Sequence, residues 1–230
     1  MHESAYDLSR RVKLFNVSRF SFREYINLKR SLRIPKLSFE EILAGEGIEL
    51  LRQEDLFNSY LQGGNLPFSL EVKDWKNALE NTLNKVINQD LTKVASLTFD
   101  DVEAIEKVLK HLGYNPAEGM NPSSIAKNIG HSRYKTESYL KLLEKSFVIQ
   151  QIWPKGSNVL KEAKILLGPT IRLLYRDFED CIGELREDFA ADCLRSAGIN
   201  FHYLKNKRGK KTPDLIVAVS YTHLKLPTMI

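Results

Sequence analysis

Two carboxylates near the C-terminal end of the chain have the placement that a metal-dependent nuclease of the restriction-endonuclease type requires. Glu187 lies in a segment of helical periodicity, and Asp214 follows Pro213 at the start of a predicted strand. Carboxylate oxygens on a helix and a strand could hold Mg²⁺ beside a scissile phosphate, and a lysine one strand later would polarise the attacking water. The sequence after Asp214 contains no acid and therefore no Glu-x-Lys strand. A chance pairing of one Glu and one Asp is the alternative.

Other catalytic and metal-binding patterns are absent from the sequence. It contains no G-x-x-x-x-G-K-[ST] loop, no histidine pair at metal-ligand spacing and no Gly-x-Ser-x-Gly elbow. Cys181 and Cys193 lie twelve residues apart without nearby histidines, which matches no zinc site, and we expect both to be reduced packing residues. The histidines are scattered, and we interpret them as surface or capping residues: His111, His131, His202 and His223.

The segment 121–149 predicts a helix-turn-helix followed by a strand, which is the order of a winged helix-turn-helix. Asn121 is a good N-cap and Pro122 suits the first helical position. Gly130 permits the left-handed residue that ends this helix, and Ser132 can cap the next one. The apolar faces are formed by Ile125, Ala126 and Ile129 in the first helix and by Tyr139, Leu140, Leu142 and Leu143 in the second, and Phe147, Val148 and Ile149 follow as strand.

If DNA binds this segment, the start of its second helix would reach base edges and flanking lysines would contact phosphates. The base-reading candidates are Ser132, Arg133, Tyr134 and Lys135, and the phosphate-contacting candidates are Lys127 and Lys141. Glu137 and Glu144 dilute the positive charge, however. A winged helix that serves as a rigid spacer between domains therefore stays as the alternative.

The composition is that of a globular protein that can bury a substantial core. The chain has 230 residues, 43% hydrophobic and 27% charged, with a net charge of +5. No stretch is apolar enough to cross a bilayer, and the first residues carry charge where a signal peptide would be apolar, so we expect a cytoplasmic protein without membrane contact. Basic residues are concentrated in 1–35 and 205–211. Either cluster could face nucleic acid or nucleotide phosphate, or be a solvated surface.

Capping signals and apolar spacing predict that residues 38–147 are nearly all helical. Ser21, Ser38 and Thr98 each open a capping pattern, and the last of these helices should end at Gly113. The remaining predicted helices are 53–61, stopped by Gly63 and Gly64, then 72–90, 170–175 and 183–196. The predicted strands are 12–17, 165–167, 201–204 and 215–219, the last two forming a hairpin or a β-β connection.

The order of short blocks along the chain resembles the prokaryotic AAA+-type ATP-binding proteins that end in a conserved, nuclease-like domain of unknown function. The blocks are SAYDLSRRV, RFSFREY, LSFEEIL, YLQGGNLPF, VINQDL, SYLKLLEKSFVI, KILLGPTIRLLY, GELREDF and KTPDLIV, and they span residues 3–219. In that family a phosphate-binding loop and an acidic magnesium-binding strand precede the segment similar to Ser4–Val12. The resemblance therefore implies ATP and Mg²⁺ for a longer parent protein, and no cofactor for the fragment.

The resemblance also implies a division into modules: the end of an ATPase core (1–35), a helical lid (36–95), a winged helix-turn-helix (96–165) and part of a restriction-endonuclease-like α/β domain (166–219). Residues 220–230 resemble translated sequencing adapter, with a genuine strand and tail as the alternative. Glu187 and Asp214 fall on the helix and strand of the nuclease-like domain, where many members look degenerate. The expected fold is mainly α with a smaller α/β part.

The expected function is that of a nucleotide-dependent switch whose winged helix binds double-stranded DNA or a protein partner. The fragment itself would bind rather than catalyse. The alternative is a nuclease-like enzyme whose metal site, Glu187 and Asp214, is truncated or vestigial.

Overall fold

The computed structural model describes residues 19–48, 52–156, 163–204 and 214–217, and it is mainly helical with two small two-stranded sheets. The helical elements before the first strand are α1 (Phe22–Arg30), α2 (Phe39–Leu43), α4 (Asp55–Ser59), η2 (Tyr60–Gly64), η3 (Pro67–Leu70), α5 (Trp75–Lys85), η4 (Val86–Leu91), α6 (Thr92–Ala95), α7 (Phe99–Tyr114), α8 (Pro122–Ile129) and α9 (Arg133–Lys145). They are followed by β1 (Ile149–Ile152), β2 (Lys164–Leu167), η5 (Ile171–Leu174), α10 (Phe178–Ser196), β3 (Phe201–His202) and β4 (Ile216–Val217). The strand predicted at 12–17, the basic run 205–211 and the segment 220–230 lie outside the described residues.

All three predicted capping patterns are formed. Ser21, Ser38 and Thr98 each accept a hydrogen bond from the backbone of the residue three positions on, whose carboxylate bonds back to the cap. In α7 that carboxylate is Asp101 instead of the usual glutamate. These reciprocal bonds satisfy two backbone donors that a helix start otherwise leaves unpaired, which is why the helices begin at these residues.

The helix predicted at 72–90 begins later and continues further than its apolar spacing indicated. The side chain of Asp74 caps the helix by accepting a hydrogen bond from the N–H of Asn77, so α5 starts at Trp75. The helical path then continues through η4 and α6 to Ala95. Gly63 has a φ of +120°, which ends the preceding helical segment as predicted. Leu83, Ile87 and Leu91 face the core from this long path.

Gly113 does not end α7, which contradicts the prediction. The helix runs one residue further, to Tyr114, and Gly113 is buried inside it. A Cβ atom at this position would lie 2.2 Å from Cδ2 of Tyr175. The glycine is therefore a point of close approach between α7 and the residues after η5, which the sequence pattern alone does not distinguish from a helix stop.

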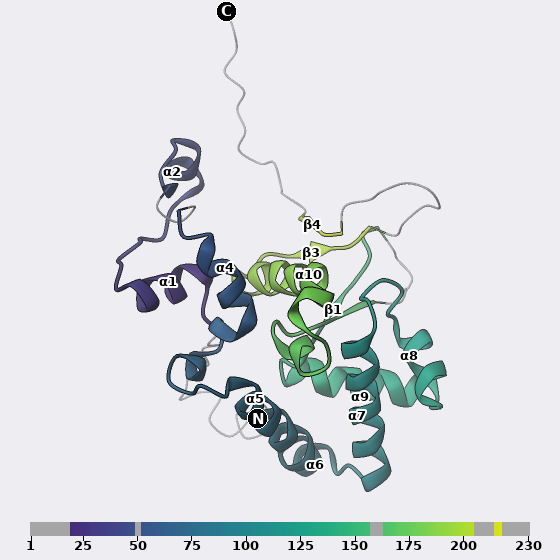
Figure 1. Cartoon of the computed structure of the whole chain (residues 1–230). Coiled ribbons are helices and arrows are strands. Elements are labelled where there is room, and N and C mark those ends of the chain that lie inside the picture. The colour runs from purple at the N-terminus through teal and green to yellow at the C-terminus, as the bar shows by residue number, and fades with distance from the viewer. Residues whose placement is uncertain (1–18, 49–51, 157–162, 205–213, 218–230) are drawn as a thin grey trace, which may run out of the picture.

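One hydrophobic core packs together the helices and strands of the middle of the chain. It contains η4, α7, α8, α9, β1 and β2, with the largest fully buried side chains being Ile87, Ile105, Leu109, Ile125, Leu140, Leu143, Ile149 and Ile165. Figure 1 shows α7, α8 and α9 grouped at one end of the molecule, α10 near its centre and α1 with α2 on the opposite side. The helix pair α8 and α9 is therefore supported by α7 and by the first sheet.

The first sheet pairs β1 with β2 in antiparallel register, from Ile149 opposite Leu167 to Ile152 opposite Lys164. The strand begins at Ile149, whereas the prediction began it at Phe147. Phe147 has a φ of +59° and its N–H donates to the carbonyl of Glu144, so the chain is still leaving α9 at this residue. The second sheet pairs β3 with β4, as the predicted hairpin requires, and a parallel bridge from Pro154 to Tyr203 connects the two sheets.

The helix α10 begins five residues before its predicted start and is held to the rest of the fold by buried polar contacts. Arg172 of η5 forms an ion pair with Asp188 of α10 at 3.0 Å, and both side chains are almost completely buried. The same guanidinium donates to the carbonyls of Leu112 and Asn115 at the end of α7. One side chain thus ties three elements together.

Candidate nucleic-acid interface

The helix pair α8 and α9 has the local geometry that its capping residues predict. Asn121 accepts a hydrogen bond from the backbone N–H of Ser124, and Pro122 occupies the first turn of α8. Gly130 ends α8 with a φ of +72°, and Ser132 caps α9 by accepting from the N–H of Lys135. A non-glycine residue in the left-handed region would be strained, so this turn depends on Gly130.

Asp101 fixes the orientation of α9 relative to α7. Its carboxylate accepts from the Tyr139 hydroxyl at 2.7 Å and from the Lys135 ammonium at 3.2 Å, while it also completes the cap of α7 with Thr98. Hydrogen bonds from Tyr139 and Thr98 hold the pKa of Asp101 well below its usual range. Burial, followed by the bond to Asp101, raises the pKa of Tyr139 to about 12. The contact joins the start of α7 to the middle of α9.

The outer side of α9 carries a stripe that we call the α9 stripe: Tyr134, Ser138, Lys141 and Lys145. These residues are all exposed, and Tyr134 is 80% exposed. They follow one another by four, three and four residues, which places them within about 60° of one another around the helix. None of its four members is acidic, and Glu137, one helical turn before Lys141, is paired with Arg133. An exposed aromatic ring followed by two lysines is therefore presented on one face of a supported helix.

The predicted DNA-contacting residues divide into two groups in the structure. Lys127 and Lys141 are exposed, and neither forms an ion pair with a carboxylate of the described residues. Arg133 and Lys135 are also exposed, but Arg133 pairs with Glu137 at 2.8 Å and Lys135 pairs with Asp101. The hydroxyl oxygen of Ser132 accepts the capping bond from the N–H of Lys135. Of the residues at the start of α9, Tyr134 has the most open side chain.

Ser138 and Lys145 belong to the same face but were not among the predicted contact residues. The signal was present in the sequence, because both recur at helical spacing from Tyr134. The prediction instead took four consecutive residues at the helix start, which cannot all lie on one face. Helical spacing adds Ser138 and Lys145 to Tyr134 and Lys141 as residues that share one exposed side.

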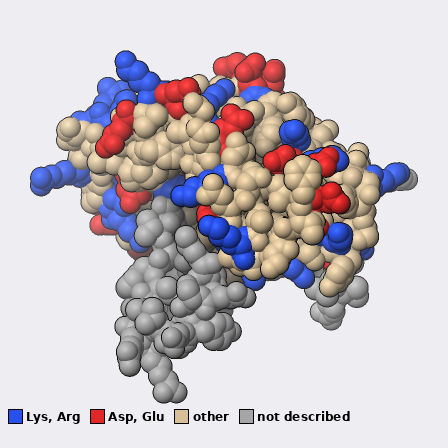
Figure 2. Space-filling model, turned by 90° about the horizontal axis from the view of Figure 1, so that it is seen from below, with Lys and Arg blue, Asp and Glu red and all other residues tan. Residues whose placement is uncertain are grey.

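The charge on the surface is mixed. Figure 2 shows lysine and arginine side chains scattered among acidic ones over the face seen from below, with no broad field of one sign. Electrostatic attraction to a polyanion would therefore come from a few local groups rather than from the whole surface. The α9 stripe is such a local group.

The carboxylates predicted for a metal site are not brought into a metal-binding group in the described part of the chain. Glu187 forms an ion pair with Lys164 of β2, and Asp214 is exposed just before β4. Among the described residues there is no group of three or more His, Cys, Asp or Glu side chains that could hold a metal ion. Cys181 and Cys193 are free thiols; Cys181 is buried as expected, whereas Cys193 is exposed and is not a core residue.

The helices of the described residues include none that is long and apolar enough to span a membrane.

Residues 54–167, from the residue before α4 to the end of β2, match the profile of a domain of unknown function (DUF8612). The uncharacterized protein MJ1637 of Methanocaldococcus jannaschii is 26% identical over 229 residues, which cover 88% of this chain and 48% of that protein. The chain thus spans about half the length of the curated relative it matches.

A solved structure, that of the S. aureus MepR–DNA complex, aligns with 50% of this chain and 79% of its own at 16% sequence identity. The TM-score is 0.29, which is too low to show a common fold. The relative and the domain profile carry no assigned activity. The functional argument therefore rests on the residues of this chain.

Proposed function

We propose that α7, α8, α9 and the β1–β2 hairpin form a winged helix-turn-helix that binds double-stranded DNA through the α9 stripe. The main support for this proposal is that the four residues of the α9 stripe are exposed and include no acid. Tyr134 lies at the start of the stripe, and Lys141 and Lys145 lie towards its end. Its support by α7, through Asp101 and Tyr139, holds it in one orientation. A rigid helix with one cationic face is what major-groove docking requires.

The dimensions of α9 suit a groove-binding helix. Its 13 residues extend over about 20 Å, and the major groove of B-form DNA is about 12 Å wide and accepts an α-helix. Tyr134 and Ser138 would face base edges, because the start of a recognition helix enters the groove deepest. Lys141 and Lys145 would contact backbone phosphates, with Lys127 of α8 contributing from the neighbouring helix.

The test is fluorescence anisotropy with a labelled 20-base-pair duplex at two salt concentrations, using the full chain and the variant Lys141→Gln/Lys145→Gln. Each phosphate contact contributes about 0.9 to the slope of log affinity against log salt, so the double variant should lose about 1.8 of that slope. At 0.1 M salt the affinity should fall roughly 10- to 60-fold.

The matched control is Lys36→Gln/Lys73→Gln, which removes the same charge from exposed positions between α1 and α2 and just before α5. In Figure 1 α1 lies on the opposite side of the molecule from α9. The control should bind like the unmodified chain. Equal losses in both double variants would mean that net charge alone drives binding, and salt-independent binding would refute phosphate contacts by the α9 stripe.

For a longer protein that contains this chain, we propose an ATP-driven switch in which the winged helix is the output module. The support is the block-by-block resemblance to AAA+-type ATP-binding proteins. The test is ATP hydrolysis by a protein that contains an upstream phosphate-binding loop, and the loss of hydrolysis when the lysine of that loop is replaced.

A protein partner at the α9 stripe is the alternative, and the DNA titration distinguishes it from duplex binding. The nuclease alternative has less support, because Glu187 is paired with Lys164 and no metal-binding group accompanies it in the described residues.

A further inference from the structure

A pocket of about 440 Å³ lies between β1 and the turn that connects α10 to β3. It is formed because β1 and β3 approach as neighbouring strands only at one end. The backbone of Tyr203 bonds with Trp153 and Lys155, and no other bridge joins β1 to β3 in the described residues. Its volume is within the range of small-molecule pockets, which is about 300–1,000 Å³.

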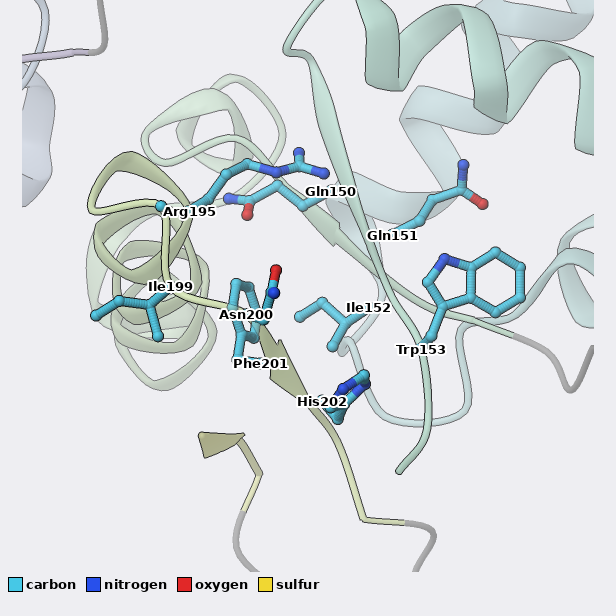
Figure 3. A pocket seen from close by; sticks show the side chains of 10 residues that line it. Gln150, Gln151, Ile152, Trp153, Arg195, Ile199, Asn200, Phe201 and His202 are labelled. Atoms are coloured by element: carbon cyan, nitrogen blue, oxygen red, sulfur yellow. The ribbon is translucent and has the colours of Figure 1, made fainter. Parts of the chain in front are cut away.

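The side chain of Gln150 is buried in the wall of this pocket without a hydrogen-bond partner. Gln150 is 3% exposed, and neither Nε2 nor Oε1 has a partner among the described residues. Figure 3 shows the side chain extending from β1 towards α10, on the side of the strand that also carries Ile152. A buried amide normally satisfies both its donor and its acceptor, and this amide has both of them unused beside a pocket.

The surroundings of Gln150 add an aromatic ring and a cation. Phe201 of β3 lines the pocket beside Asn200. Arg195 of α10 lies at the rim, where its guanidinium is held by Glu144 at 2.8 Å and is still about one third exposed. The Glu144 carboxylate accepts a hydrogen bond from one of the five guanidinium N–H donors, which leaves the outer edge of Arg195 able to bind an anion.

We propose that this pocket binds the adenine base of a nucleotide, with the base edge on Gln150 and the phosphate towards Arg195. A glutamine amide presents a donor and an acceptor side by side, and this pattern pairs with N7 and N6 of adenine. The corresponding edge of guanine has two acceptors and leaves the amide oxygen opposed to an acceptor. Phe201 supplies an aromatic wall for the flat base. The site is separate from the α9 stripe and does not depend on the proposed duplex binding.

The same base could belong to a free nucleotide or to an unpaired strand end, and the experiment separates the two. The full chain is titrated with AMP, with GMP and with a single-stranded oligo(dT) that ends in one adenine, by calorimetry. Adenine should bind at least about fivefold more tightly than guanine, the lower limit for a bidentate base contact. Gln150-dependent binding of AMP assigns the source to a free nucleotide, and Gln150-dependent binding of the oligonucleotide alone assigns it to a strand end.

The variant Gln150→Leu removes both hydrogen-bonding atoms but keeps the side chain apolar and similar in size. Because the amide is unpaired, the melting temperature should stay equal or rise, while adenine binding is lost. Gln89→Leu, at an exposed position in η4, is the matched control and should bind normally. Absence of adenine binding by the folded chain, equal binding of AMP and GMP, or full binding by Gln150→Leu would overturn the proposal.

Discussion

Replacing Arg172 by methionine should cost more stability than any surface substitution in this chain. Arg172 and Asp188 are 1% and 0% exposed, and the guanidinium also serves the carbonyls of Leu112 and Asn115. Methionine keeps much of the volume but leaves a buried carboxylate and two buried carbonyls without their donor. Removing one partner of a buried ion pair typically costs about 3–5 kcal/mol. The denaturation midpoint in urea should therefore fall by about 1 to 2 M.

The pH dependence gives this prediction a second signature. Burial raises the pKa of the Asp188 carboxyl to about 7, and the Arg172 guanidinium acts against that rise. In the unmodified chain this raised pKa means that stability falls as the pH increases from about 4 to about 7; without Arg172 the folded state keeps the Asp188 proton to a higher pH, so the loss continues above pH 7. The difference between Arg172→Met and the unmodified chain should therefore be smaller at pH 5 than at pH 8.

The double variant Arg172→Met/Asp188→Leu is the control for the mechanism. It also removes the buried carboxylate that the single variant leaves unpaired. The double variant should therefore recover most of the lost free energy of unfolding, as apolar replacements of buried ion pairs often do. Urea unfolding followed by circular dichroism at both pH values measures all three proteins. A loss below about 1 kcal/mol in the single variant, or a double variant no more stable than the single one, would refute the assigned role of the pair.

Two further predictions concern α7. Gly113→Ala should lower the free energy of unfolding by about 1–3 kcal/mol, because the new Cβ would lie 2.2 Å from the Tyr175 side chain. Gly183→Ala, at a position in α10 with open space around it, should raise the free energy of unfolding by up to about 1 kcal/mol. Thermal melts of both variants test this, and equal effects would contradict it. The lowered pKa of Asp101, which Tyr139 and Thr98 cause, contributes stability that is present above about pH 4 and is lost as the pH falls further. Asp101→Asn should therefore flatten the acid side of the stability curve and cost about 1 kcal/mol at pH 7, and an unchanged acid limb would contradict the assignment.

Local structure was largely determined by the sequence. Ser21, Ser38, Thr98 and Asn121 begin helices as predicted, because an N-cap and its partner three residues later form a contact that needs no tertiary support. The turn at Gly130 was predictable for the same reason, since a left-handed residue between two apolar periodicities has few other solutions. The stripe on α9 could also have been derived, because helical spacing alone defines which residues share a face.

Contacts between distant segments were decided only by the tertiary structure. Nothing in the spacing of Arg172 and Asp188 indicates that they are paired, or that Lys164 meets Glu187, because each pair joins elements whose approach depends on the packing of the whole core. The sequence pattern predicts a helix stop at Gly113, and only the folded structure shows that Tyr175 packs against this glycine. The unpaired amide of Gln150 belongs to the same class, since its side chain becomes buried only where β1 faces the turn after α10. Sequence thus determined the capped helix starts and the turn at Gly130, and long-range packing determined other helix ends, such as that of α7, and which side chains are paired, buried or left available for a ligand.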